Sequence, residues 1–285
     1  MVFKNKSHHI KNNIWKRIMK ILTAYYPDKK FPALSVTGRE CVQQCKHCRG
    51  RFLKGMIPVK PENIISIAEE LQSQGAEGFL LSGGCDSRGR VEVMPFLNAI
   101  KRIKTETDLK INIHTGFLKK PEAVELTAAG VDSFSVDIVQ DKKVIKDCLN
   151  LDVLPGAYEE TLEALEGAAK IVPHVCIGLQ SAEGETASLK LISKFNVSSI
   201  VVLGLIPAPG MKSRAERMPS FISEAVKTGK PVTLGCMRPR GNTSLDIECI
   251  KAGASAIAVP SSKTIEILKE EGWTVVEKSG CCSLF

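Results

Sequence analysis

The stretch Ile200-Val201-Val202-Leu203 decides the fold class, because consecutive large apolar residues suit a strand buried on both faces of a sheet. Strands of this kind occur in parallel sheets that are covered by helices. Other short runs rich in β-branched and apolar residues recur along the chain. Together, the eight runs cover residues 33–36, 78–82, 110–114, 133–139, 174–179, 199–205, 231–234 and 255–259.

Segments with helical periodicity lie between these runs, as at residues 61–74 and 158–171. Glycine dipeptides mark the expected helix ends, at Gln74-Gly75, Ala129-Gly130 and Ala252-Gly253. Each βα unit takes about 28 residues, close to the repeat of a (β/α)₈ barrel. We therefore predict an α/β fold with a complete or nearly complete TIM-type barrel. A doubly wound open sheet is the alternative, since periodicity alone does not show closure.

The composition is that of an ordinary soluble globular protein, with 285 residues, 44% hydrophobic and 25% charged. No apolar run approaches the ~20 residues needed to cross a bilayer. We therefore expect no membrane-spanning segment.

The positive charge is concentrated at the start of the chain. Residues 1–30 contain eight Lys or Arg and one acid, which accounts for seven of the net +8 charges. We divide the chain into a basic N-terminal helical extension at residues 1–30 and a barrel with a C-terminal tail at residues 31–285. The apolar spacing predicts a helix at residues 10–22, which either caps the barrel or faces a partner or membrane. We expect no nucleic-acid partner, because the rest of the chain is nearly neutral.

Ten cysteines are present, and the start of the sequence does not read as a secretory signal. Cysteines of cytosolic proteins serve more often as metal ligands or catalytic groups than as disulfides. We expect a reducing, cytoplasmic compartment and a thiolate-bound metal.

The sharpest motif is Cys41-Val-Gln-Gln-Cys45-Lys-His-Cys48, directly after the first predicted strand. In a barrel, the loop after a strand opens onto the catalytic face. Thiolates bind iron–sulfur clusters, zinc or cuprous copper. Three thiols in one loop leave a fourth metal position open, which suits a cubane cluster with one iron free. A structural zinc with a distant fourth cysteine is the alternative.

The motif and the βα alternation together resemble the radical S-adenosylmethionine (SAM) superfamily, over nearly the whole chain. The phrases Leu34-Ser-Val-Thr-Gly-Arg-Glu-Cys41 and Leu234-Gly-Cys236-Met-Arg-Pro-Arg240 resemble its biotin-synthase-related group. They look most like the second component of the archaeal-type two-protein lipoyl synthase. The resemblance implies a 4Fe–4S cluster on Cys41, Cys45 and Cys48, with SAM on the fourth iron. Reductive cleavage of SAM would then give a 5′-deoxyadenosyl radical for C–H activation.

The same resemblance suggests where SAM binds. His47 stands where the family usually has an aromatic residue near adenine, and Ser82-Gly83-Gly84-Cys85-Asp86 stands where it usually has Gly-Gly-Glu. Cys85 replaces the expected acid, so either Asp86 substitutes for it or Cys85 is itself a metal ligand. The remaining SAM contacts implied are Ser135, Asp137, Gly178 and Leu205, with ordinary barrel packing as the alternative role.

A lipoyl-synthase-like activity implies sulfur insertion into an octanoyl chain on a carrier protein or peptide. It also implies a second radical SAM protein, an electron donor such as ferredoxin or flavodoxin, and an auxiliary iron–sulfur cluster that supplies sulfur. We assign that cluster to Cys85, Cys236, Cys281 and Cys282, in the expectation that the tail folds over the barrel mouth. The alternative is a pair of incidental rim thiols and a reactive tail.

The other cysteines, Cys148, Cys176 and Cys249, are expected to pack as small apolar groups, with metal binding as the alternative for Cys176 if it faces the lumen. Arg238 and Arg240 either clamp a carboxylate, ligate a cluster or are ordinary rim charges, and His114 either shuttles protons or is a core histidine. Two rival functions remain open: a radical SAM enzyme of cofactor biosynthesis without sulfur transfer, through rearrangement or methylation, and a non-enzymatic zinc or iron–sulfur protein.

Overall fold

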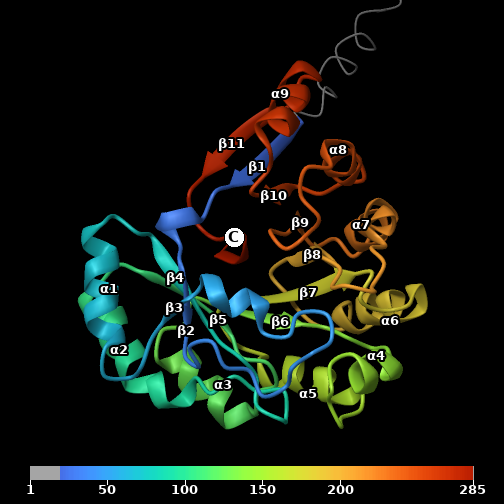
Figure 1. Ribbon diagram of the computed structural model, residues 1–285. Coiled ribbons are helices and arrows are strands. Elements are labelled where there is room, and N and C mark those ends of the chain that lie inside the picture. The colour runs from blue at the N-terminus through green and yellow to red at the C-terminus, as the bar shows by residue number, and fades with distance from the viewer. Residues whose placement is uncertain (1–19, 285) are drawn as a thin grey trace, which may run out of the picture.

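The computed structural model describes residues 20–284. Within them, one parallel sheet of eleven strands runs in the order β11-β1-β10-β9-β8-β7-β6-β5-β4-β2-β3. Figure 1 shows the sheet curving around a centre, with helices on its outer side. The edge strands β11 and β3 are not paired with each other, so the barrel is nearly complete but open.

The strands are short, as expected for βα units. They are β1 Ile21–Tyr25, β2 Ala33–Ser35, β3 Ile57–Pro58, β4 Gly78–Ser82, β5 Lys110–His114, β6 Ser133–Asp137, β7 Ile171–Ile177, β8 Ile200–Gly204, β9 Val232–Leu234, β10 Ala256–Ala258 and β11 Thr274–Lys278.

The α-helices connect successive strands and cover the outside of the sheet. They are α1 Ile64–Ser73, α2 Leu97–Glu106, α3 Lys120–Ala128, α4 Lys142–Asp147, α5 Gly156–Ala164, α6 Ala182–Ile192, α7 Met218–Val226, α8 Thr243–Lys251 and α9 Ser262–Glu270. Single turns of 3₁₀-helix are η2 Asp28–Lys30, η3 Arg51–Gly55, η4 Met94–Phe96, η5 Ala215–Arg217 and η6 Cys282–Leu284.

The prediction of a nearly complete α/β barrel is confirmed, and all eight predicted strands are present in sequential order. The start of β7 was placed too late, because Pro173 reads as a break in a strand. Pro173 pairs with Val136 of β6, whereas the register with β8 begins only at His174. The missing proline N–H is therefore tolerated.

The N-terminal prediction is wrong at its end. Ile21 and Leu22 were read as the last turn of a helix, but they begin β1, which pairs with both β10 and β11. A spacing of four between Ile18 and Leu22 suits a helix, yet pairing with two neighbouring strands overrides that local preference. The rest of the predicted helix lies outside the described residues. The sequence pattern also missed β3 and β11, which are short and largely exposed.

Two apolar clusters stabilise the barrel. The larger lies between the sheet and its helices. The smaller lies inside the barrel, where Cys282 packs against Val172, Val201, Ala256 and Ala258. The tail thus fills part of the lumen, a space that barrels normally fill with strand side chains.

A buried ion pair joins the end of β9 to α8. Arg238 is 2% exposed, and its guanidinium donates to both carboxylate oxygens of Asp246 at 2.8 and 3.0 Å. It also donates to the carbonyl oxygens of Gly235 and Ala258, at 2.7 and 2.8 Å. Arg238 is therefore a structural residue, and its predicted roles as a carboxylate clamp or cluster ligand are wrong.

Among residues 20–284, no helix combines the length and the apolar character needed to span a bilayer.

Replacing Asp246 with Asn keeps its volume but leaves the charge of Arg238 buried without a counterion. We expect the free energy of unfolding to fall by about 3 kcal/mol, measured by urea denaturation. The matched control is Glu271→Gln, which removes the partner of Lys251 from a more exposed pair and should cost less than about 1 kcal/mol. Equal losses in the two variants would contradict the role of Arg238.

Candidate active site

The cysteine loop (residues 41–48) follows β2 and lies against the end of β4. The carbonyl oxygen of Cys85 accepts hydrogen bonds from the amides of Val42 and Gln43, at 3.0 and 3.2 Å. A Cβ atom on Gly84 would lie 2.0 Å from the carbonyl oxygen of Glu40, so only glycine fits there. The Gly-Gly pair therefore lets β4 approach the cysteine loop closely.

Two of the three thiols of the motif lie close together, and the third lies on another side of the loop. Ligand atoms of Cys45, His47 and Cys48 all lie within 4.8 Å of one another. The Cys41 sulfur lies 3.9 Å from the carbonyl oxygen of Cys85, on the β4 side of the loop. Soft sulfur donors grouped in this way fit an iron–sulfur cluster, and the nearby imidazole also fits zinc.

The protonation of the two closest thiols differs. The thiol of Cys45 donates a hydrogen bond to the Cys48 sulfur and is buried, so the pKa of Cys45 lies well above its ordinary value. Accepting that bond lowers the pKa of Cys48 to about 6, against the opposing effect of burial and with help from His47. Cys48 is therefore a thiolate at neutral pH, the form that binds metals.

Cys85 belongs to the surroundings of the cysteine loop. Burial raises its pKa to about 12, and the charges that add to this effect include those of Cys41, Asp137 and Cys48. It was grouped by sequence with the tail cysteines. The charges that act on Cys85 are those of the cysteine loop and of Asp86 and Asp137, whereas Cys236 is influenced by Cys281.

The tail (residues 279–284) enters the barrel rather than covering its mouth, which corrects the expectation. Asn112 of β5 donates to the Cys281 sulfur at 3.9 Å, and the hydroxyls of Ser135 and Ser283 lie 3.3 Å apart. Lys170, just before β7, donates to the carbonyl oxygen of Leu284 at 2.7 Å. The tail consequently lies in the lumen, where Cys281 and Ser283 contact the middle residues of β5 and β6.

The tail thiols also interact with each other. The hydrogen bond from Cys282 lowers the pKa of Cys281 to about 7, with further help from Ser283 and Asn112, although burial opposes the shift. The same hydrogen bond with Cys281 and burial raise the pKa of Cys282, and Cys236 lies close enough to add to this shift. Three of the four predicted auxiliary ligands are therefore brought into one region.

The predicted SAM contacts have mixed surroundings. Asp137 is exposed at the end of β6, but Ser135 is buried and bonded to Asn112 and the tail. The Asp86 carboxylate accepts hydrogen bonds from the amides of Arg88 and Arg90, so it stabilises the turn in which it lies. Burial would raise the pKa of Asp86, but these hydrogen bonds lower it.

The other two predicted contacts lie at the ends of β7 and β8. Gly178 has a left-handed backbone and donates its amide to the Glu185 carboxylate at 2.8 Å. Leu205 is 2% exposed and donates its amide to the carbonyl oxygen of Ile177 at 2.8 Å.

The structure also shows the surroundings of His114 and Arg240, whose roles the sequence left open. The Nε2 atom of His114 is buried and has no hydrogen-bond partner among the described residues, and its ring meets that of His174 edge-on at 5.3 Å. Burial lowers the pKa of His174 to about 4, so this histidine is neutral. Arg240 is exposed and lies 3.5 Å from the carbonyl oxygen of Cys236.

Sequence reasoning missed the segment at residues 148–150, which follows α4 and contacts the cysteine loop. Cys148 was expected to pack as an apolar group, but its sulfur lies 3.9 Å from Nδ1 of His47. Asn150 donates to two carbonyl oxygens of the loop. Asn150 has a left-handed backbone, a conformation that Asn and Gly tolerate best, but the sequence alone does not show it.

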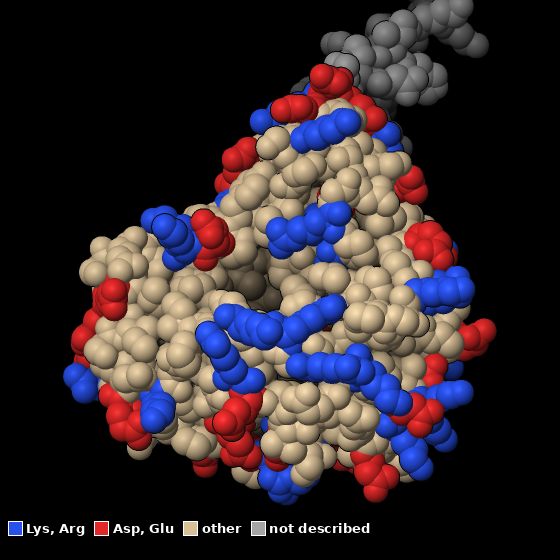
Figure 2. Space-filling view, viewed as in Figure 1, with Lys and Arg blue, Asp and Glu red and all other residues tan. Residues whose placement is uncertain are grey.

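Positive side chains surround the opening of this face. Figure 2 shows Lys and Arg gathered around a central hollow. Exposed cations follow β2 and β8, including Lys46, Arg49, Lys212 and Arg214. Arg51 links the two regions, because its guanidinium donates to the carbonyl oxygen of Ile206 at 2.5 Å.

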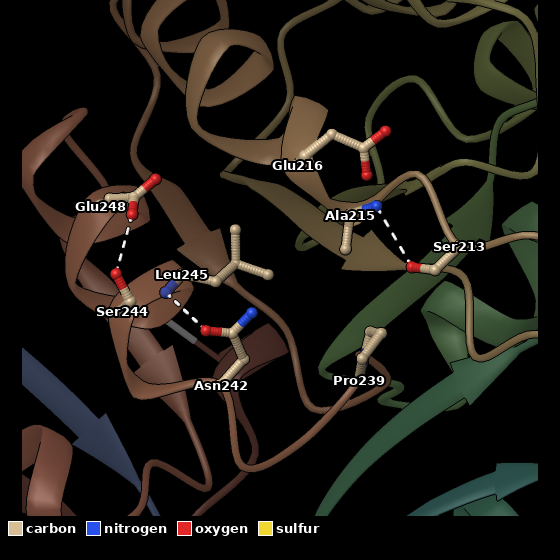
Figure 3. Close-up of a pocket in the computed structure, with 8 residues that line it drawn as sticks. All are labelled: Ser213, Ala215, Glu216, Pro239, Asn242, Ser244, Leu245 and Glu248. Carbon is tan, nitrogen blue, oxygen red and sulfur yellow. Dashed lines mark hydrogen bonds between the residues drawn. The ribbon is translucent and has the colours of Figure 1, made fainter.

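A separate pocket of about 410 Å³ lies between the loops before α7 and α8 (Figure 3). Two of its hydrogen bonds are local caps, from the Leu245 amide to Asn242 and from the Ala215 amide to Ser213. It contains none of the thiols and is not the candidate site. Its lining residues are Ser213, Ala215, Glu216, Pro239, Asn242, Ser244, Leu245 and Glu248.

No protein-family model matches the chain. It is similar to biotin synthase from Natronomonas pharaonis, with 23% identity over 67% of this chain and 55% of that protein. It is also similar to biotin synthase from Marinobacter nauticus, with 23% identity over 79% of this chain and 68% of that protein. The alignments thus span between about half and two thirds of these relatives' own lengths.

Solved structures share the fold. The FeFe-hydrogenase maturase HydG from Carboxydothermus hydrogenoformans has a TM-score of 0.63 at 15% identity, covering 90% of this chain and 68% of that chain. Methylornithine synthase has a TM-score of 0.59 at 13% identity, covering 88% and 85%. Streptococcus suis SuiB bound to S-adenosylmethionine has a TM-score of 0.51 at 14% identity, covering 82% and 51%.

The chain is thus similar to biotin synthases and shares its fold with these solved structures, so the predicted resemblance to the biotin-synthase-related group is confirmed. The closer resemblance to lipoyl synthases stays a prediction.

Alkylation of the metal-free protein checks the protonation of the loop thiols. Because Cys48 has a lowered pKa, its alkylation rate should rise between about pH 5 and 7 and then level off, whereas an ordinary thiol is half-ionised near pH 8.5. Peptide mass spectrometry follows Cys48 alone. In Cys45→Ala, which lacks the hydrogen-bond donor, the midpoint should move up. A midpoint near pH 8.5 in the parent protein would contradict the thiolate assignment.

Proposed function

We propose that this chain is a radical SAM enzyme that holds a 4Fe–4S cluster on Cys41, Cys45 and Cys48 and binds SAM beside it. The observation that carries the proposal is the grouping of these thiols in one loop at the carboxyl ends of β2 and β4. When bound, the cluster and SAM supply a 5′-deoxyadenosyl radical, which abstracts hydrogen from an unactivated C–H bond.

The chain's own residues bind the cofactors and shield the reaction. The Cys48 thiolate is ready to ligate metal, and Gly83 and Gly84 bring the backbone of β4 close to the loop. Asp137 is exposed at the end of β6, where its carboxylate can accept hydrogen bonds from hydroxyl groups of SAM. His47 lies beside Cys45 and Cys48, where its ring can pack on the nucleoside.

The tail supports the same function by filling part of the lumen. Cys282 and Ser283 are 6% and 2% exposed, so the tail displaces water from this part of the barrel. Exclusion of water protects a reactive radical from side reactions.

For the substrate, we propose sulfur insertion into an octanoyl chain attached to a carrier protein or peptide. The carrier, a second radical SAM protein and an electron donor such as ferredoxin or flavodoxin are the partners of this proposal. The cations around the hollow suit an acidic carrier.

The sulfur source of this proposal is an auxiliary cluster in the lumen. Cys236, Cys281 and Cys282 are its ligands, because the tail brings these thiols together. Cys85 is retained as a group beside the first cluster and not as a ligand of the second.

A radical SAM enzyme without sulfur transfer is the second candidate. Within residues 20–284, the only grouping of three ligand atoms within 4.8 Å is Cys45, His47 and Cys48. This observation favours one cluster per chain and hence rearrangement or methylation.

Substitution of any loop cysteine tests the main proposal. In Cys41→Ala, Cys45→Ala and Cys48→Ala, formation of 5′-deoxyadenosine from SAM should be abolished, because two thiols cannot hold the cluster with an open iron. The measurement is chromatography of anaerobically reconstituted protein with SAM and dithionite. The control Cys249→Ala removes a core thiol and should remain active. Zinc in place of iron, or an active loop variant, would refute the proposal.

Iron counting tests the sulfur-insertion proposal. Substitution of Cys236, Cys281 or Cys282 by Ala should lower the iron content by one cluster, about two to four iron atoms per chain. Formation of 5′-deoxyadenosine should remain intact. Cys249→Ala again serves as the control. A parent protein with a single cubane would instead support the candidate without sulfur transfer.

A further inference from the structure

The cysteine loop and the residue that follows it contain an unusual backbone conformation. Gln44 and Arg49 both have left-handed φ values, 45° and 48°, although neither is glycine. Non-glycine residues adopt this conformation only when their surroundings impose it. The loop therefore needs an external support.

The segment at residues 148–150 provides contacts to every residue from Gln43 to His47, and we call it the clamp segment. These contacts are Asn150 Nδ2 to the carbonyl oxygens of Gln43 and Gln44 at 3.0 and 2.9 Å, Gln43 Nε2 to Leu149 O at 2.9 Å, Cys45 Sγ to Leu149 O at 3.6 Å, Lys46 N to Cys148 O at 2.8 Å, and Cys148 Sγ to His47 Nδ1 at 3.9 Å.

The clamp segment is itself anchored. The amides of Leu149 and Leu151 donate to carbonyl oxygens of α4, at 2.9 and 3.0 Å, and both side chains are buried in the main apolar core. Asn150 has a φ of 55°, a left-handed conformation that favours Asn or Gly. A fixed element therefore holds a strained loop.

We propose that the clamp segment sets the cysteine loop in its ligand-binding conformation before any metal arrives, and that Asn150 is its positioning residue. The inference rests on the proposed cluster site. The Asn150 amide donates to the carbonyl oxygens of Gln43 and Gln44, which directly precede Cys45, so it holds the backbone that leads into the Cys45–Cys48 group. A preorganised loop loses less conformational freedom on binding, and it releases metal more slowly.

Two variants of Asn150 separate the amide from the backbone. Asn150→Gly keeps the left-handed turn but removes the amide, and Asn150→Asp keeps the shape but turns a carboxylate oxygen toward two carbonyl oxygens. Because Asn150 is exposed, both variants should fold. The matched control is Asn242→Gly, which removes a similar exposed amide that caps α8, away from the thiols.

Hydrogen exchange of the metal-free protein is the first measurement. The Lys46 amide, bonded to Cys148, should exchange about fivefold faster in both Asn150 variants and at the parental rate in the control. The second measurement is iron release from reconstituted protein to a chelator, which should accelerate by a similar factor. The electron paramagnetic resonance signal of the reduced cluster should also change shape in Asn150→Asp.

Parental exchange and parental iron release in both variants would overturn the proposal. A parent protein that takes up no iron–sulfur cluster would refute the proposed function instead. In that case, the exchange of Lys46 would still decide whether the clamp segment holds the loop.

Discussion

The close contact between the end of β4 and the cysteine loop is the constraint on which the site depends. One carbonyl oxygen, that of Cys85, accepts two consecutive amides of the loop, and Gly84 leaves room for no side chain between them. The loop has little regular structure of its own, so this contact fixes where it begins. The clamp segment then contacts its middle, next to the group formed by Cys45, His47 and Cys48.

The lumen shows a division of chemistry around the barrel. The strands β5 to β7 contribute Asn112, His114, Ser135 and His174, whereas β8, β10 and β1 contribute an apolar wall. A tail with two thiols lies between these halves. Burial keeps His174 neutral. The polar half of the lumen therefore avoids the cost of an isolated buried charge at this residue.

Much of the fold was predictable from sequence, because buried parallel strands such as β8 have a composition that few other elements share. The loop motif was equally clear, since its spacing is local. The position of the tail could not be predicted, because nothing in Ser-Gly-Cys-Cys-Ser indicates whether a segment folds over a barrel or into it. The separation of Cys85 from Cys236 also escaped prediction, since it depends on how the ends of β4 and β9 are spaced around the opening. Asn150 gave no signal because its partners are backbone carbonyl groups, which are present at every residue.

The position of β1 has a consequence for the synthesis of the chain. Thr23 aligns with both Ala256 and Val276, so the strand lies between two partners from the far end of the sequence. During translation, β1 leaves the ribosome long before its neighbours β10 and β11 are made. The strand must therefore wait with both edges unpaired while the βα units form, and such contacts between distant segments slow folding. Chaperones that shield exposed strand edges would be most useful to this protein during that interval.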